Sequence, residues 1–279
     1  MMHKHFARAQ SDGDDTAFTD AIYRANQAFE GSIKEAFRVL ADKDPQRMRP
    51  YEIEKYLEEE KVFRDRILTL FTNYRTDWRN PSTHDYSLDF DEDEAFLAII
   101  SVSAFAKLLV DQIAEKLSFA ATVRDLERRE VDTAQLPATD DGLDRVTSLF
   151  ESFASHYARQ SSSTPIESEA QLMGALAGFL TSMAPDLHTS TGRIVRTSKP
   201  NYIDMIIDGL GGSIVVELKR GQNANLIEQG KTQLLSYLGA ANAKLGILFM
   251  YVSGATEYIT ENFDEEALEL RLRIIRPAR

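Results

Sequence analysis

Apolar residues recur three and four positions apart through most of the first 160 residues, and runs of β-branched residues are rare there. This spacing lines up apolar side chains on one face of a helix, so the pattern predicts a series of amphipathic helices. The expected helices cover residues 22–37, 56–74, 92–126 and 143–159, with a potential break of the third near Ser118. The first part of the chain is therefore expected to be all-α.

The pattern changes after the small polar run at residues 161–164, where Pro165 disfavours continuation of a helix. Beyond this boundary, alternating and continuous apolar runs predict strands, and other segments keep a helical spacing. In chain order, the expected elements are a helix at 165–183, strands at 193–197, 201–208 and 213–220, a helix at 224–240, a strand at 244–252, a further helix, and a strand at 268–275. The sequence thus predicts a two-domain α+β protein, with a helical domain over residues 1–160 and an α/β domain with a mixed central sheet over residues 165–279.

The composition is that of a soluble globular protein, with 43% hydrophobic and 27% charged residues among 279. Because the chain has no cysteine, disulfides, thiolate zinc sites and cysteine nucleophiles are excluded, and a reducing cytoplasm is the expected compartment. The first residues lack an apolar segment of signal-peptide length. The most apolar helix-length run, Ala95 to Val110, is shorter than a bilayer span and contains Lys107, so we expect a buried helix and no membrane association.

The net charge of -12 argues against a generic basic coat for nucleic acid, since phosphate binding relies on clustered lysine and arginine. The acidic excess is uneven, because the part from Pro165 onward has 11 basic and 13 acidic residues. That part could therefore still carry a local basic groove. Candidate phosphate contacts are Lys199, Arg220 and Lys231, although scattered surface cations explain the same residues.

Three charged residues interrupt the apolar strands at 201–208 and 213–220. Glu217 and Lys219 share one face of their strand and Leu218 points to the other, while a glycine-rich hairpin can bring Asp204 beside Glu217. Two adjacent carboxylates repel unless a cation lies between them, and Mg²⁺ is the natural match for oxygen ligands. A nearby lysine could hold a water or a phosphate, which suits phosphodiester hydrolysis. The alternative is a structural ion-pair cluster at a sheet edge.

Two helices offer further polar groups. Glu169 is expected on the inward stripe of the helix at 165–183, where it could join the metal site; the alternative is a first-turn glutamate favoured by the helix dipole. Gln233 and Tyr237 are four residues apart on the helix at 224–240, and with Gln229 they form a polar ridge. This ridge could contact a nucleic-acid backbone or hold the lysine, whereas ordinary helix surface gives the same pattern.

Asp204, the Glu217-Leu218-Lys219 triplet, and Gln233 with Tyr237 together resemble the PD-(D/E)xK nuclease superfamily with a RecB-type QxxxY motif. The resemblance covers roughly residues 165–279 and implies a restriction-endonuclease-like fold. It implies that Asp204, Glu217 and the carbonyl of Leu218 bind Mg²⁺ or Mn²⁺, that Lys219 positions or activates water, and that Glu169 completes the site. The pattern departs from the family in that Ile203 rather than proline precedes Asp204, while the literal Pro185-Asp186 pair is expected in a loop.

These observations predict a cytoplasmic, Mg²⁺-dependent deoxyribonuclease whose helical domain senses, recruits or forms a homo-oligomer. A role in prokaryotic antiviral defence follows by analogy alone. The alternatives are a non-catalytic nucleic-acid- or protein-binding module on the same fold, and a junction resolvase. The GKT sequence at residues 230–232 is not a P-loop, because Asn225 stands where that motif needs glycine.

Overall fold

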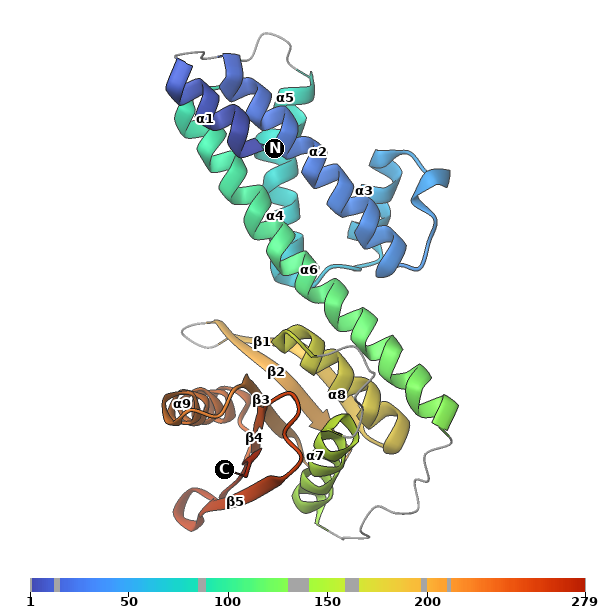
Figure 1. Ribbon diagram of the computed structural model, residues 1–279, viewed down its shortest axis with the longest axis vertical. Coiled ribbons are helices and arrows are strands. Elements are labelled where there is room, and N and C mark those ends of the chain that lie inside the picture. Colours follow the sequence, from blue (N-terminus) through green and yellow to red (C-terminus); the bar gives the residue numbers. More distant parts are fainter. Residues whose placement is uncertain are drawn as a thin grey trace. The chain divides into compact units, whose positions relative to one another are not determined.

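The computed structural model describes residues 2–12, 16–84, 89–129, 141–158, 166–196, 200–209 and 212–278. The chain forms two compact units, Met1–Ile113 and Ala114–Arg279 (Figure 1). The expected boundary at residues 161–165 lies outside the described residues. The helix at 142–158, which the sequence placed in the first domain, belongs to the second unit, because its apolar face packs into the core beneath the sheet.

The first unit is all-helical, as predicted. Its elements are α1 (Met2–Asp12), α2 (Thr16–Val39), the 3₁₀ turn η1 (Pro45–Arg47), α3 (Pro50–Glu59), α4 (Asp65–Tyr74), the π-helical turn η2 (Arg75–Arg79), α5 (Asn80–His84) and the first part of α6 (Glu92–Arg129). The single helix expected over residues 56–74 is wrong. Lys61 adopts a left-handed φ of 50°, and the Val62 amide donates to the Leu57 carbonyl, which closes α3 before α4 begins.

Helix α6 continues through Ser118 without the break that the sequence left open. One face packs into the core of the first unit through residues that include Ile99, Val102 and Phe105. The opposite face is exposed, so the expectation of a buried helix holds for one face only. Among the described helices, α6 alone is long and apolar enough to cross a membrane, which is weak evidence because core helices meet the same criterion.

The second unit is built around a mixed sheet. Its described elements after α6 are α7 (Gly142–Ala158), α8 (Glu169–Met183), β1 (His188–Arg196), β2 (Pro200–Asp208), β3 (Ile214–Arg220), α9 (Ala224–Ala241), β4 (Leu245–Tyr251), β5 (Tyr258–Glu265), the 3₁₀ turn η4 (Glu266–Leu268) and β6 (Leu270–Pro277). The strand order is β1-β2-β3-β4-β6-β5. β3, β4 and β6 run parallel, and the other neighbouring pairs are antiparallel. The predicted α+β organisation and mixed sheet are confirmed.

One expected element differs, since the segment before the last strand forms β5 rather than a helix. β5 pairs along its whole length with β6, from Tyr258 opposite Pro277 to Glu265 opposite Leu270. It is an edge strand with an exposed outer part, which includes Ile259 and Phe263. Backbone pairing with β6, rather than burial of one face, therefore determines its conformation.

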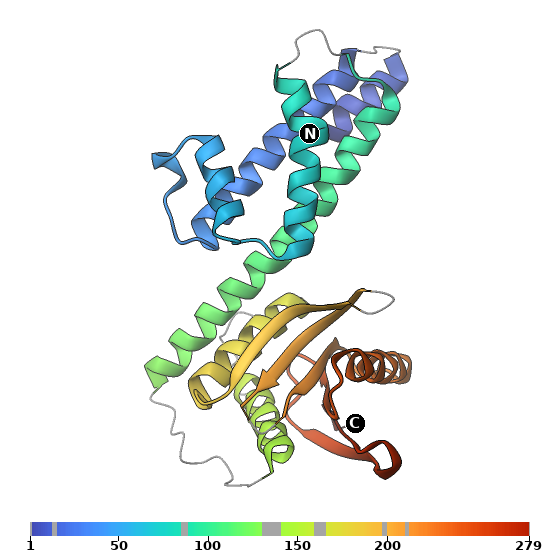
Figure 2. The same cartoon turned by 180° about the vertical axis from the view of Figure 1, so that it is seen from behind.

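Helices cover both faces of the sheet. α7 and α8 lie on one face and α9 lies on the other, as the two opposite views show (Figures 1 and 2). β4 is buried almost throughout, as its continuous apolar sequence predicted. α9 approaches closely at Gly230, where an added Cβ would lie 2.6 Å from Cδ1 of Leu248. This close packing fixes α9 across the sheet next to the charged end of β3.

Candidate active site

The charged residues of β3 lie in the middle of the sheet. β3 has β2 on one side and β4 on the other, so the alternative of an ion-pair cluster at a sheet edge is wrong in its placement at the edge, although Lys219 and Glu217 do form an ion pair. Glu217 is only 1% exposed, and the Lys219 side chain is 13% exposed. Leu218 points to the opposite face, where it joins the core under α7 and α8. A central strand thus carries buried charges on its α9 face, and buried charges need specific partners.

Asp204 lies where β2 and β3 part. Their ladder runs from Ile207 opposite Ile214 to Met205 opposite Val216. One residue further along, the amide of Leu218 donates to Oδ2 of Asp204 at 2.8 Å. The carboxylate thus serves as acceptor for a strand amide, which orients Asp204 toward the Glu217 side of β3. The predicted placement of Asp204 beside Glu217, through antiparallel pairing of β2 and β3, is confirmed.

Glu217 has an unusual electrostatic environment. Burial and the charge of Asp204 raise its pKa, Lys219 opposes both, and the pKa is raised from 4.5 to about 8. The ammonium of Lys219 donates a hydrogen bond to Oε1 of Glu217, so these two side chains do point the same way. The other oxygen, Oε2, is buried and finds no hydrogen-bond partner among the residues that the structure describes. Beyond Lys219 and without a cation, the Glu217 carboxyl can pair only by sharing a proton with Asp204, since a side-chain hydrogen bond between the two acids lowers the pKa of Asp204 and raises that of Glu217.

The pKa values of Asp204 and Lys219 are also raised. Burial raises the pKa of Asp204, and the nearby charge of Glu169 raises it too, while the Leu218 amide and Lys219 work in the opposite direction. Burial alone would lower the pKa of Lys219, but its hydrogen bond to Glu217 and the surrounding carboxylates raise it overall. Two carboxylates and one ammonium thus leave a net negative charge when both acids are ionised, which favours a cation.

The residues fit a hard divalent cation as far as oxygen donors are concerned. Asp204 and Glu217 supply carboxylate oxygens from neighbouring strands, and the buried Oε2 of Glu217 lacks any other partner in the described part of the chain. Over the same residues, no group of three histidine or acidic side chains is close enough to hold a metal ion. A bound ion would therefore draw on this pair, on the predicted Leu218 carbonyl and on water.

Glu169 does not lie where the sequence placed it. It is the first residue of α8, directly after the N-cap Ser168, and it is exposed rather than on the inward stripe. The first-turn position agrees with the helix-dipole alternative. Glu169 is nevertheless close enough to raise the pKa of Asp204 and of Lys219. Its charge thus acts at the solvent side of the cluster.

Tyr237 of α9 faces the carboxylates, whereas Gln233 does not contact them in any interaction that we observe among the described residues. Burial raises the pKa of Tyr237 to about 12, and the charges of Glu217 and Asp204 contribute. The phenol is therefore protonated at neutral pH. Gln233, one helical turn earlier, is exposed. The ridge predicted on α9 thus divides into a residue at the cluster and a residue at the surface.

The expected phosphate contacts are dispersed. Arg220 is exposed and donates to the backbone carbonyl of Glu167, which ties the end of β3 to the start of α8. Lys231 forms an ion pair with Glu228 at 3.0 Å. Lys199 lies outside the described residues. The Pro185-Asp186 pair lies in a turn, as expected, where Asp186 pairs with Arg145 of α7.

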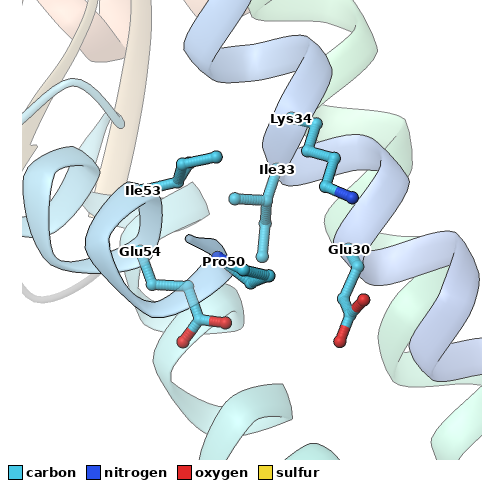
Figure 3. Close-up of a pocket in the computed structure, with 6 residues that line it drawn as sticks. All are labelled: Glu30, Ile33, Lys34, Pro50, Ile53 and Glu54. Carbon is cyan, nitrogen blue, oxygen red and sulfur yellow. The ribbon is translucent and has the colours of Figure 1, made fainter. Parts of the chain in front are cut away.

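Sequence reasoning missed a buried ion pair in the first unit. Glu54 is 5% exposed and lies 3.3 Å from Arg79, and burial raises its pKa while Arg79 and Arg75 lower it. Glu54 also borders a narrow surface hollow between α2 and α3 (Figure 3). The hollow is lined by Glu30, Ile33, Lys34, Pro50, Ile53 and Glu54. The sequence does not distinguish Glu54, because α3 carries other glutamates at positions 52, 58 and 59 that are half-buried or exposed.

No family model, curated protein or solved structure matches this chain. The site therefore rests on its own geometry. That geometry brings Asp204, Glu217, Lys219 and Tyr237 together and leaves Glu169 at the margin.

Proposed function

We propose that the second unit is a PD-(D/E)xK nuclease with a restriction-endonuclease-like fold, which hydrolyses DNA phosphodiester bonds with Mg²⁺ or Mn²⁺. The observation that carries this proposal is the buried carboxyl pair of Asp204 and Glu217, in which Oε2 of Glu217 has no hydrogen-bond partner in the described part of the chain apart from a proton shared with Asp204. A buried acceptor costs free energy unless something pairs with it. A divalent cation would satisfy both carboxylates at once.

Asp204, Glu217 and the carbonyl of Leu218 would hold this ion. When bound, it would supply a more acidic water and neutralise charge on the phosphate. Lys219 keeps its proton, because its pKa is raised, so its ammonium can orient a water or a phosphate oxygen beside Glu217. Tyr237 stays protonated at neutral pH and can donate a hydrogen bond toward the same place.

The test is cleavage of supercoiled plasmid, linear duplex, single-stranded DNA, RNA and four-way junctions by the full chain. We expect cleavage with Mg²⁺ and none with EDTA. Glu217→Gln and Lys219→Met keep the side-chain shape and should each lower the rate at least about 100-fold, as expected for losing one electrostatic contact to the transition state. Glu228→Gln changes the same charge on an exposed side chain and should cleave at the wild-type rate.

Equal rates for wild type, Glu217→Gln and Lys219→Met would refute the catalytic proposal. A strong preference for four-way junctions would identify a junction resolvase within the same reaction class. The role in cytoplasmic antiviral defence remains a proposal by analogy, and a fall in phage plaque number on cells expressing wild type but not Glu217→Gln would support it.

The existing ion pair between Lys219 and Glu217 favours a second candidate, a non-catalytic module that binds DNA or protein. In that case the pair serves to hold β3 and the cluster in place. Tight DNA binding without cleavage under Mg²⁺, Mn²⁺, Ca²⁺ or Co²⁺, unchanged by Glu217→Gln, would support this candidate.

A further inference from the structure

Helix α6 has a second apolar face that the first unit leaves uncovered. Phe96, Leu97, Ile100 and Val110 are between 51 and 59% exposed. Val102 and Phe105, which α6 contributes to the core, are at most 1% exposed. A surface helix of a globular protein usually has one apolar face and one polar face. A second apolar face therefore indicates a second packing partner.

The spacing of this face is that of helix pairing. We define the α6 stripe as Phe96, Leu97, Ile100, Ser103, Lys107 and Val110. Positions 96, 100, 103, 107 and 110 alternate intervals of four and three, which is the heptad period that keeps two helices in contact. The stripe extends over about 21 Å, at 1.5 Å per residue. We propose that a second copy of this chain packs antiparallel along the α6 stripe.

Lys107 decides the direction of pairing. In the heptad it takes a core position, where a parallel partner would place its own lysine against it. An antiparallel partner centred on residue 105 instead places Lys107 opposite the partner's Ser103 and Ile100 opposite the partner's Val110. The small serine leaves room for the lysine, which already pairs with Asp111 at 2.6 Å. The stripe is thus complementary to itself under a two-fold rotation, as a symmetric dimer requires.

A membrane is a poorer occupant. The face of α6 opposite the stripe is buried in protein, so lipid could not surround the helix. Lys107 and Asp111 lie along the exposed side. The N-terminal end of α6 is acidic, with Asp91, Glu92, Asp93 and Glu94. Anionic headgroups repel such a surface and the chain's net charge of -12. A helical partner tolerates these charges because they can stay at the rim.

The first test is the molar mass of the full chain, measured by light scattering on a sizing column. We expect a dimer for wild type and a monomer for Ile100→Glu at the same concentration, with at least a 100-fold weaker association. Tyr51→Glu is the control, because Tyr51 is 59% exposed on α3 and lies outside the stripe. Unchanged circular dichroism would show that both variants fold. A monomeric wild type, equal dimerisation of the two variants, or Ile100-dependent binding to phosphatidylglycerol vesicles would overturn the proposal.

The second test uses the absence of cysteine from the chain. Ile100→Cys combined with Val110→Cys should give a covalent dimer on mild oxidation. Ile100→Cys alone should not, because two copies of position 100 would be about 15 Å apart along the axis, beyond the reach of a disulfide. Cross-linking of Ile100→Cys alone would refute the antiparallel arrangement. These outcomes do not depend on nuclease activity, so the two proposals can fail separately.

Discussion

Replacing Glu217 by glutamine tests the central electrostatic feature of the site without DNA. The folded pKa of Glu217 is about 8, against an ordinary value of 4.5. Between these values the folded protein binds more protons than the unfolded chain, so its stability falls as pH rises through that window. At about 1.4 kcal/mol per pKa unit, the loss is about 3 kcal/mol at pH 7 and about 5 kcal/mol above pH 8. Glutamine has no proton to lose.

Without metal, Glu217→Gln should therefore match wild type near pH 4.5 and become more stable than wild type as pH rises. For a unit of this size, about 3 kcal/mol corresponds to a Tm higher by about 6–12 °C at pH 7. Mg²⁺ should reverse the order, because only wild type offers both carboxylates. An ion present at about 1,000 times its Kd stabilises by about 4.1 kcal/mol, which exceeds the difference of about 3 kcal/mol at pH 7.

The assay is thermal unfolding from pH 5 to pH 9, in EDTA and in Mg²⁺, followed by circular dichroism. Glu228→Gln serves as control, because its side chain is 72% exposed and carries the same charge. Parallel loss of stability in Glu217→Gln and wild type between pH 6 and pH 9 would refute the buried-charge argument. An equal rise of Tm with Mg²⁺ in both proteins would refute the assignment of Glu217 as a metal ligand.

Other predictions concern packing, capping and proton release. Gly174→Ala should destabilise the second unit by about 1–3 kcal/mol or more in urea unfolding, because the added Cβ would lie 2.1 Å from the backbone oxygen of Glu115. Gly239→Ala, with no described atom within 4 Å, should instead stabilise it by up to about 1 kcal/mol, and the same sign for both variants would contradict the close helix contact. Ser168→Ala removes the N-cap of α8 and should cost about 0.5–2 kcal/mol by the same measurement; no change would mean that the cap is dispensable. Calorimetry in buffers of different ionisation enthalpy should detect a proton released by Glu217 on Mg²⁺ binding at pH 7 but little release at pH 9, and buffer-independent heats at both pH values would contradict its raised pKa.

The sequence predicted elements best where burial decided them. The segments that became β2, β3 and β4 are rich in apolar and β-branched residues, and this composition predicted their strand character. The strand period of two then placed Glu217 and Lys219 on one face, as the structure confirms. The sequence did not predict β5, because this strand is held by backbone pairing with β6 and exposes Ile259 and Phe263. Its apolar residues therefore do not form the pattern of a half-buried strand.

Other details depend on tertiary partners that a pattern does not contain. The apolar spacing over residues 56–74 continued through Lys61, where the left-handed backbone ends α3. The helix expected from residue 165 begins about one turn later, at Glu169. Glu169 is therefore the first residue of α8 and does not lie on the inward stripe. α6 is apolar on most of its surface, so the sequence alone could not show which face the first unit would cover.

The hydrogen bond from the Leu218 amide to Asp204 has a practical consequence for finding the natural target. An asparagine oxygen can accept the same bond, so Asp204→Asn should leave the strand ends in place while removing one of the two acidic charges. Under the nuclease proposal, such a protein would be intact in shape yet unable to complete a turnover. Expressed in cells and recovered with its bound nucleic acid, it would serve as a trap whose contents can be sequenced.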